Sequence, residues 1–213
     1  MTLSRLLIAT ALATALPALA ATSTFDTGTE GWTAQGDVEG AIQWIGTGGR
    51  PGGHVFIDDR TVGGVTYFVA PAAFRGDRSG ALGTNLTFDL QQVYPGSPNQ
   101  FDSSDVILEG NGQTLVFDTT ANPTNGAWTS YAVPLSAPGW KVSALSGAAA
   151  TPEQFAAVLA NLTALKIRAE YQTGADVGHL DNVALVPEPG TWAMLLAGVC
   201  CLGLAFRRGR TSA

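Results

Sequence analysis

Both ends of this 213-residue chain are apolar and flanked by basic residues, so only the segment between them can form a water-soluble fold. The chain begins with one positive charge, Arg5, followed by an apolar run and the small-x-small sequence Ala18-Leu19-Ala20. This order of charge, apolar run and small residues is typical of a secretory signal peptide. We assign residues 1–20 to a signal helix that signal peptidase removes, with Ala18 and Ala20 at the cleavage site, and expect an exported protein.

The C-terminal end repeats this pattern in reverse. An apolar stretch of about 15 residues, Trp192 to Phe206, precedes Arg207, Arg208 and Arg210. A comfortable span takes about 20 residues, but a shorter segment crosses when flanking side chains snorkel or the bilayer thins. The positive-inside rule places the arginines in the cytoplasm and the preceding domain outside. We therefore predict a C-terminal membrane helix.

The segment between these ends is acidic and contains no cysteine. It holds seven of the 11 basic and 16 of the 17 acidic residues, which gives a net charge of about −9. Nucleic acids and anionic lipid head groups attract cationic surfaces, so we expect no nucleic-acid partner. Both cysteines, Cys200 and Cys201, lie in the C-terminal tail. The domain must therefore fold without a disulfide, and cysteine-based metal, redox and nucleophile sites are excluded from it.

Short alternating segments separated by glycine and proline predict β-structure. Apolar residues occupy every second position in Leu86–Gln91 and in Leu165–Tyr171, as in strands with one buried face. Asp105–Glu109 and Thr114–Asp118 are joined by Gly110-Asn111-Gly112-Gln113, a hairpin signal. Further strands are predicted at Ala41–Ile45, His54–Asp58, Thr66–Ala70, Thr129–Val133 and Val183–Val186.

One segment has the period of a helix. Thr151 can cap it, Pro152 suits its first turn, and Gln154 completes a capping box. Phe155, Val158, Leu159 and Leu162 then share one face. About ten strands and one short helix predict an all-β, two-sheet sandwich of jelly-roll type over residues 22–186.

The tail that follows the domain has three parts in a fixed order. Pro187, Glu188 and Pro189 precede the apolar run, and Arg207 and Arg208 end it. This arrangement over residues 187–213 resembles the PEP-CTERM sorting signal of Gram-negative bacteria that secrete extracellular polymeric substance. The resemblance implies recognition by an exosortase, a membrane-embedded cysteine transpeptidase, with processing near Pro187–Pro189. It also implies a membrane-anchored intermediate at the inner membrane, followed by the cell surface or the extracellular space.

The domain resembles the laminin B domain, also called laminin domain IV type A. The segments that carry the likeness are Phe25–Trp32, Tyr67–Asp77, Gly83–Leu90, Trp128–Leu135, Ala160–Tyr171 and Leu180–Val183. The resemblance implies a galactose-binding-like jelly roll used in extracellular structure, and it carries no catalytic signature.

No active site is recognisable, so we expect a protein that is not an enzyme. A glycosidase needs two carboxylates about 5 to 9.5 Å apart, whereas Asp105 and Glu109 on one strand face are separated by roughly 13 Å. No Gly-x-Ser-x-Gly motif is present. The two histidines, His54 and His179, are interpreted as ordinary surface or edge residues. The sequence leaves open whether folding brings two other carboxylates within this distance of each other.

Two speculative sites follow from residue types. No cofactor is required, but sandwiches of this kind often hold a structural calcium where the first and last strands meet. Its candidate ligands are Asp26, Glu30 and Asp181. The alternative places these carboxylates in turns and strand ends. The candidate residues for stacking on sugar rings are Trp32, Trp44, Trp128 and Trp140, against the alternative that they pack in the core.

The leading functional hypothesis is a structural or adhesive surface module that acts among extracellular matrix proteins or polysaccharide. The alternative is a carbohydrate-binding module for extracellular polysaccharide, stabilised in one version by calcium. A glycoside hydrolase is the third and weakest hypothesis.

Overall fold

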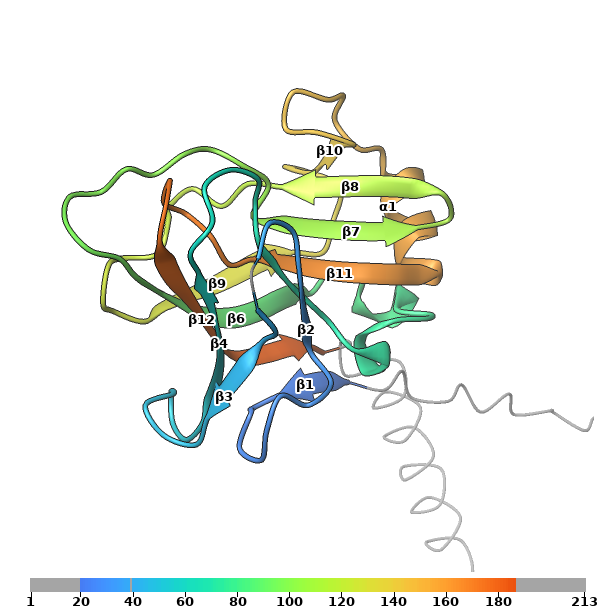
Figure 1. Cartoon of the computed structure of the whole chain (residues 1–213). Helices are drawn as coiled ribbons and strands as arrows, with labels where there is room; N and C mark the ends of the chain where they lie inside the picture. Colours follow the sequence, from blue (N-terminus) through green and yellow to red (C-terminus); the bar gives the residue numbers. More distant parts are fainter. Residues whose placement is uncertain (1–19, 39, 187–213) are drawn as a thin grey trace, which may run out of the picture.

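A computed structural model describes residues 20–38 and 40–186. They form two antiparallel sheets packed face to face, as the sequence predicts (Figure 1). Sheet A has the order β3–β4–β12–β6–β9, with β1 added beside β12. Its strands are β1 (Ala21–Ser23), β3 (Gln43–Ile45), β4 (His54–Asp59), β6 (Asn85–Val93), β9 (Thr129–Pro134) and β12 (Asp176–Leu185).

Sheet B has the order β10–β8–β7–β11–β5–β2. Its strands are β2 (Thr33–Gln35), β5 (Tyr67–Val69), β7 (Val106–Gly110), β8 (Gln113–Phe117), β10 (Lys141–Val142) and β11 (Leu162–Arg168). Two short 3-10 helices, η1 (Ala72–Phe74) and η2 (Ser79–Ala81), and the helix α1 (Pro152–Ala160) complete the described fold.

The core is built from the inward-facing residues of both sheets and is rich in aromatic rings. Trp32 packs edge-to-face on Phe25 and Phe74, and Trp140 does so on Phe155. All five side chains are fully buried. Edge-to-face contacts suit the quadrupoles of aromatic rings, so these rings contribute specific packing as well as apolar area in a domain without disulfides.

Helix α1 begins where the sequence predicts and for the predicted reason. The Thr151 hydroxyl accepts a hydrogen bond from the Gln154 backbone amide at 3.2 Å, and the Gln154 side chain accepts one from the Thr151 amide at 2.9 Å. This reciprocal pair satisfies two donors that a helix start leaves unpaired. Phe155, Val158 and Leu159 are buried, whereas Leu162 already belongs to β11.

The first and last strands of the described domain lie side by side. Strand β1 pairs with the end of β12, with Ala21 opposite Leu185, so the chain enters and leaves the sandwich beside the C-terminal end of this central strand of sheet A. Several predicted features lie outside the described residues. They are the signal helix, Ala18 of the cleavage site, the C-terminal membrane helix and the sorting residues Pro187, Glu188, Pro189, Arg207 and Arg208. Within the described residues, no helix has the length and apolarity needed to cross a bilayer.

Gly178 in β12 marks a close approach of the chain inside the sandwich. A Cβ at this position would lie 2.1 Å from the carbonyl oxygen of Ala169, and the glycine does not have a positive φ. We predict that Gly178→Ala lowers the free energy of unfolding by about 2 kcal/mol through overpacking, which chemical denaturation measures. Gly40→Ala is the matched control, because nothing lies near its Cβ. An equal effect at both positions would contradict the steric explanation.

Candidate functional site

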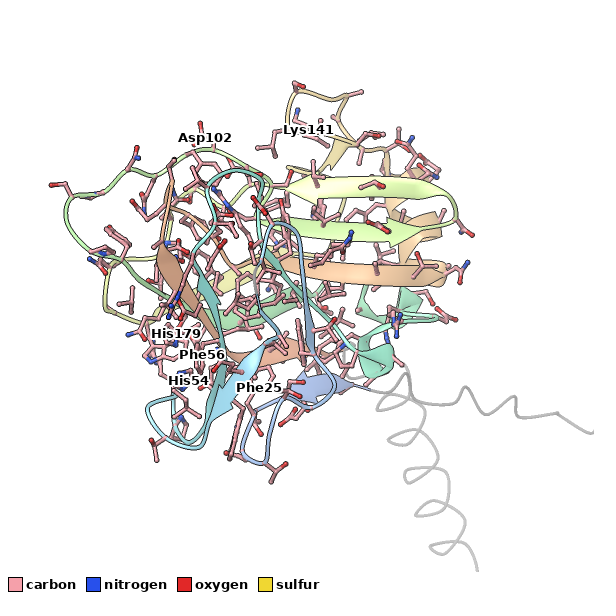
Figure 2. The ribbon with its side chains drawn as sticks, in the orientation of Figure 1. Phe25, His54, Phe56, Asp102, Lys141 and His179 are labelled. Carbon is pink, nitrogen blue, oxygen red and sulfur yellow. The ribbon has the colours of Figure 1, made fainter. Side chains whose placement is uncertain are left out.

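The outer face of sheet A carries a cluster of aromatic and imidazole rings. In β4, Val55 and Ile57 point into the core, so His54 and Phe56 point outward by the period of two. His179 of β12 lies opposite Phe56 in the register. Trp128, immediately before β9, joins these three side chains, and we call the four residues the aromatic patch. Figure 2 shows His54, Phe56 and His179 together at the side of the domain formed by β4 and β12.

The rings of the aromatic patch are in mutual contact. His179 stacks on Phe56 with ring centroids 5.7 Å apart, and Trp128 meets His54 edge-on at 5.4 Å. The Trp128 ring is also 6.2 Å from His179, and its indole nitrogen donates to the carbonyl of Gly48 at 3.0 Å. The patch therefore holds its side chains in fixed orientations on a rigid sheet, which limits the entropy lost on ligand binding.

The two histidines of the patch form a neutral pair at pH 7. Nε2 of His54 and Nδ1 of His179 are 3.0 Å apart, so one ring donates to the other. Burial, reinforced by the neighbouring His54, lowers the pKa of His179 to about 4. Burial also lowers the pKa of His54, partly offset by a hydrogen bond to the backbone of Thr47. The patch is therefore uncharged at neutral pH.

A polar network adjoins the patch one step further along the strands. Asp89 of β6 lies opposite both Asp181 of β12 and Ser130 of β9. Its carboxylate accepts hydrogen bonds from Ser130 and, at 2.9 Å, from the Asn182 side chain. The guanidinium of Arg50 lies 3.9 Å from Asp89 and is about half exposed, so solvent weakens this ion pair. The network offers donors and acceptors beside the apolar rings.

Two shallow hollows flank these residues on the same face. One, of about 370 Å³, lies beside the polar network, and its lining comprises Thr87, Phe88, Asp89, Ser130, Tyr131, Ala132 and Asn182. The other, of about 410 Å³, lies beyond the patch and is lined by Asp58, Val93, Tyr94, Pro95, Ala175, Asp176 and Val177. Along β6, Thr87 and Val93 are six residues apart, about 20 Å. The outer face thus presents an elongated strip of alternating apolar and polar character.

The structure corrects the sugar-stacking prediction for two of the four tryptophans. Trp32 and Trp140 are buried with 1% and 0% exposure, and their indole nitrogens donate to Ser23 Oγ and to the Pro134 carbonyl. Because no ligand can reach them, these two residues are core residues. Trp44 is 40% exposed, but it lies opposite Val55, which faces the core. Trp44 is therefore on the inner side of sheet A, away from the outward-facing His54 and Phe56.

The expectation for the histidines also needs correction. His54 is 95% buried rather than a surface residue, and His179 lies within β12 rather than in a loop. Sequence reasoning missed Phe56 altogether. The alternation in His54-Val55-Phe56-Ile57 was the available signal, because it places the histidine and the phenylalanine on one face and the aliphatic residues on the other.

The three predicted calcium ligands do not form one cluster. No group of three or more histidine, cysteine or acidic side chains with a metal-holding arrangement occurs among the described residues. Asp181 is fully buried, whereas Asp26 and Glu30 are exposed and Glu30 sits in a turn with φ of 50°. Burial raises the pKa of Asp181, and the backbone amides of Arg50 and Asn182 partly offset the shift.

Asp26 and Asp181 do converge on the same loop, residues 46–53. A Cβ on Gly49 would lie 2.5 Å from Asp181 Oδ2, and one on Gly52 would lie 2.6 Å from Asp26 Oδ1. A Cβ on Gly53 would lie 2.4 Å from the carbonyl oxygen of Phe25. Carboxylate and carbonyl oxygens around a glycine loop are the donors that calcium prefers, so Asp26, Asp181 and the Phe25 carbonyl fit the ion in donor type. Glu30 is not part of this set.

A second polar cluster is buried inside the sandwich and consists of Asp59, Glu170 and Asp176, which we call the acid cluster. Each side chain is at most 3% exposed. Thr66 bridges two of them: its hydroxyl donates to Asp59 at 2.9 Å and its amide donates to Glu170 at 3.0 Å. The Oδ1 atom of Asp176 has no hydrogen-bond partner in the described structure. A buried, unpaired carboxylate oxygen favours the protonated acid.

The residues around the acid cluster do not neutralise it. Burial, with repulsion from Asp59, raises the pKa values of Glu170 and Asp176 to about 7 each, while Arg168 lowers both only slightly. Arg168 is committed to Asp105, whose Oδ1 it meets at 3.3 Å, and to the rings of Phe101 and Tyr171. Although Asp176 contributes to the lining of the hollow of about 410 Å³, it is only 3% exposed, and Asp59 and Glu170 are each 2% exposed. The acid cluster therefore offers no accessible pair of carboxylates to a sugar.

The outer face of sheet A, as the structure describes it, has no accessible pair of carboxylates of the kind that the hydrolase hypothesis requires. Asp89 and Asp181 lie opposite each other, but Asp181 is fully buried and both carboxylates accept several hydrogen bonds. Asp58 lies opposite Val177, four residues from Asp181 along β12 and so about 13 Å away. Asp105 and Glu109, which strand spacing already excludes as a catalytic pair, form ion pairs with Arg168 and Lys166.

Taken together, the described residues form an all-β, two-sheet sandwich with one α-helix. The sequence profile of the laminin B (domain IV) family matches residues 67–187, more than half of the chain, and that of the PEP-CTERM protein-sorting motif matches residues 185–210. The chain therefore belongs to the laminin B (domain IV) family and carries a PEP-CTERM motif. Export and membrane anchoring before surface localisation follow from that motif, as does exosortase processing.

Individual similar proteins agree with this assignment. The laminin subunit gamma-1 of Xenopus tropicalis is 29% identical over 178 residues, which cover 77% of this chain and 10% of that protein. The chain thus spans about a tenth of the length of this relative. The L4b domain of human laminin alpha-2 superposes with a TM-score of 0.51 at 19% identity, covering 57% of this chain and 70% of that domain.

A carbohydrate-binding module shares the fold. The family 11 module from Clostridium thermocellum, solved in complex with a β-1,3-1,4-mixed-linked tetrasaccharide, has a TM-score of 0.51 at 17% identity. The match covers 79% of this chain and 95% of that module. At this identity the likeness confirms the two-sheet jelly roll and goes no further. Both structural neighbours are binding or structural domains rather than catalytic ones.

The acid cluster predicts that the domain loses stability as pH rises. Glu170 and Asp176 have raised pKa values, about 7 in the fold against 4.5 and 3.8, so the folded state retains protons that the unfolded state has released. Their stabilising contribution is complete below about pH 4 and is lost as pH rises through 7. Between pH 6.5 and 8 we expect these two groups to lower the free energy of unfolding by about 1 to 2 kcal/mol. His54 and His179, whose pKa values are lowered from 6.5 in the fold, oppose this by less than about 1 kcal/mol over the same range.

Urea unfolding at several pH values measures this slope. Asp176→Asn keeps an acceptor for the Tyr171 and Gln172 amides and removes one titration, so it should remove about half of the acid cluster's contribution to the slope. An unchanged slope in this variant would contradict the assignment. Asp77→Asn, at an exposed carboxylate outside the cluster, is the matched control and should leave the slope as it is.

Proposed function

We propose that this protein is an exported surface module that adheres to neutral extracellular polysaccharide through the outer face of sheet A. The observation that supports the proposal is the aromatic patch, set on a rigid sheet between two hollows and beside hydrogen-bonding side chains. Binding sites for small polar ligands combine apolar walls with a few fixed polar groups. Sugars require this combination, since a pyranose ring has an apolar C–H face and a rim of hydroxyl groups.

Each part of the strip has a role in this proposal. Phe56, His179 and Trp128 offer ring faces and edges to the C–H faces of sugar rings. Asp89, Asn182 and Arg50 offer acceptors and donors to hydroxyl groups. The length of about 20 Å along β6 suits a chain of several sugar residues rather than a single one.

The charge of the domain favours a neutral polysaccharide. The exported segment carries about −9, and like charge repels uronate-rich or sulfated polymers over roughly 10 Å at 0.1 M salt. Because burial lowers the pKa values of His54 and His179, the four residues of the aromatic patch carry no positive charge at neutral pH. The tetrasaccharide bound by the family 11 module is a neutral ligand of the expected kind.

A structural or adhesive contact with matrix proteins is the second candidate, and family membership favours it. Laminins and a basement-membrane proteoglycan are similar to this chain over 56–84% of its length. In that case the outer strip would bind protein, and soluble glycans would not compete.

Replacement of the exposed ring tests the polysaccharide proposal. Trp128 contacts two rings of the patch and is partly exposed, so Trp128→Ala should weaken binding about tenfold, equivalent to about 1.4 kcal/mol. Affinity electrophoresis of residues 21–186 in gels that contain mixed-linked β-glucan, other neutral glucans or a polyuronate measures the effect.

Trp44→Ala is the matched control for this experiment, because Trp44 is exposed but lies off the outer strip. It should bind as the wild type does once thermal unfolding confirms that it is folded. If none of the neutral glucans retards the wild type, the polysaccharide proposal is rejected and the matrix-protein candidate remains.

We also propose a structural calcium ion at the loop of residues 46–53, held by Asp26, Asp181 and backbone carbonyl oxygens. The ion would offset the buried charge of Asp181 and fix the loop whose Gly48 carbonyl orients Trp128. Calcium at millimolar concentration should raise the melting temperature by several degrees, because a ligand at 100 times its Kd stabilises by about 2.7 kcal/mol.

Asp181→Asn should abolish this increase, whereas Glu30→Gln should retain it, because Glu30 lies outside the converging oxygens. Differential scanning calorimetry with calcium and with a chelator provides the readout. A melting temperature that is the same in calcium and in chelator would reject the ion site.

A further inference from the structure

The chain ends leave the sandwich close together, at an end formed by a small set of elements. Ala21 lies opposite Leu185, and Leu185 lies opposite Leu86 at the start of β6. Helix η1 contacts β1, and η2 precedes β6 by three residues. Figure 1 shows β1, η1 and the end of β12 gathered where the two chain ends depart. We call this the terminal end of the domain.

The terminal end is held near the bilayer while the sorting tail is attached. Strand β12 ends at Leu185, and the apolar run of the sorting motif begins at Trp192. Trp192 follows Val186 by six positions in the chain, and a segment of this length spans at most about 20 Å. Because membrane anchoring follows from the PEP-CTERM motif, the terminal end cannot move far from the head groups.

The surface of the terminal end differs from the rest of this acidic domain. Arg75 is exposed directly after η1, and Arg78 follows three residues later, with Asp77 between them bonded to Ser79. Leu82 is 46% exposed, and Val186 is 44% exposed beside the exit of the chain. The exposed Arg75, the half-buried Arg78, whose guanidinium donates to the Ala73 carbonyl, and two exposed aliphatic side chains therefore lie near the exit. The acids there are Asp77 and, two positions after Val186 in the sequence, Glu188, so this end is close to neutral in a domain that carries about −9 overall.

We propose that the terminal end is a membrane-facing surface that contacts anionic phospholipid before the sorting tail is processed. Each basic side chain near an anionic leaflet contributes about 1 kcal/mol, and the aliphatic side chains add a small apolar contribution at the interface. The remaining acidic surface is repelled by the same leaflet, which orients the domain with its terminal end down and the outer face of sheet A free.

The contact is too weak to hold the domain without its tether. Two bases and two aliphatic side chains supply a few kcal/mol at most, which the net charge opposes. Processing near Pro187–Pro189 therefore releases the domain from the membrane as well as from the tail. This inference does not depend on what the outer face of sheet A binds.

Site-specific fluorescence tests the orientation with the chain lacking only the signal peptide, residues 21–213, in vesicles. The domain has no cysteine, so a single introduced cysteine can carry an environment-sensitive label once Cys200 and Cys201 are changed to serine. The two labelling sites are Ala73→Cys in η1 and Ser97→Cys beyond the far end of β6. In phosphatidylglycerol vesicles, spin-labelled lipid should quench the label at position 73 and not at position 97. A label at Cys200 in a separate sample verifies insertion of the tail.

Charge-reversal variants separate specific contact from simple proximity. Arg75→Glu combined with Leu82→Asn should reduce the quenching at position 73 by at least half, whereas Arg60→Glu, the same charge change at the end of β4, should leave it unchanged. With the tail inserted, equal quenching at positions 73 and 97 would overturn the proposal. The proposal would also be overturned if quenching at position 73 were as strong in phosphatidylcholine vesicles as in phosphatidylglycerol vesicles. The same holds if the double variant were quenched as strongly as the wild type.

Discussion

The central placement of β12 is the constraint on which the rest of the structure depends. This strand is paired with β4 on one side and β6 on the other, and its last three residues also pair with β1. Ten residues of one strand therefore fix the register of three neighbouring strands at once. They place His179 beside Phe56 and Gln91 on the outer face, bury Leu180 and Val183 in the core, and lead directly into the sorting motif.

A bulge in β12 makes the polar half of the outer strip possible. The register shifts between Asp181 and Ala184, and Asn182 has φ of 50°, in the region that asparagine tolerates better than most residues. The extra residue lets Asp181 accept from the Arg50 amide while the Asn182 side chain reaches Asp89. The glycine loop at residues 46–53 can pack against the strand only because Gly49 leaves room for the Asp181 carboxylate.

Local pattern predicted most of the fold, because strands and the helix cap depend on neighbouring residues. Nine predicted strands and α1 are present, with bounds that differ by a few residues. Strands β1, β2 and β10 were missed because two or three residues carry no periodicity, and the first half of β12 was missed because Gly178 and the bulge interrupt it.

Trp128 was among the predicted sugar-contacting residues, but its partners are His54 and His179, which are 125 residues apart in the chain. Their pairing depends on which strands become neighbours, and no single-sequence pattern encodes that choice. The sequence likewise could not distinguish Trp32 and Trp140 from Trp128, since all three lie in similar polar surroundings along the chain.

The geometry of β12 also determines how the domain would carry a mechanical load between a polysaccharide and the membrane anchor. The proposed ligand contacts His179 and Asn182, and the tether leaves from Leu185 of the same strand. A pull between the two acts along β12, whereas the ladder hydrogen bonds to β4 and β6 are perpendicular to the strand. The proposed contacts with Phe56 of β4 and Asp89 of β6 pass their share of the load to β12 through these ladder bonds, which are then loaded in shear together. In the proposed adhesive role this arrangement matters, because the domain has no cysteine and its resistance to extraction would rest on hydrogen bonds and core packing alone.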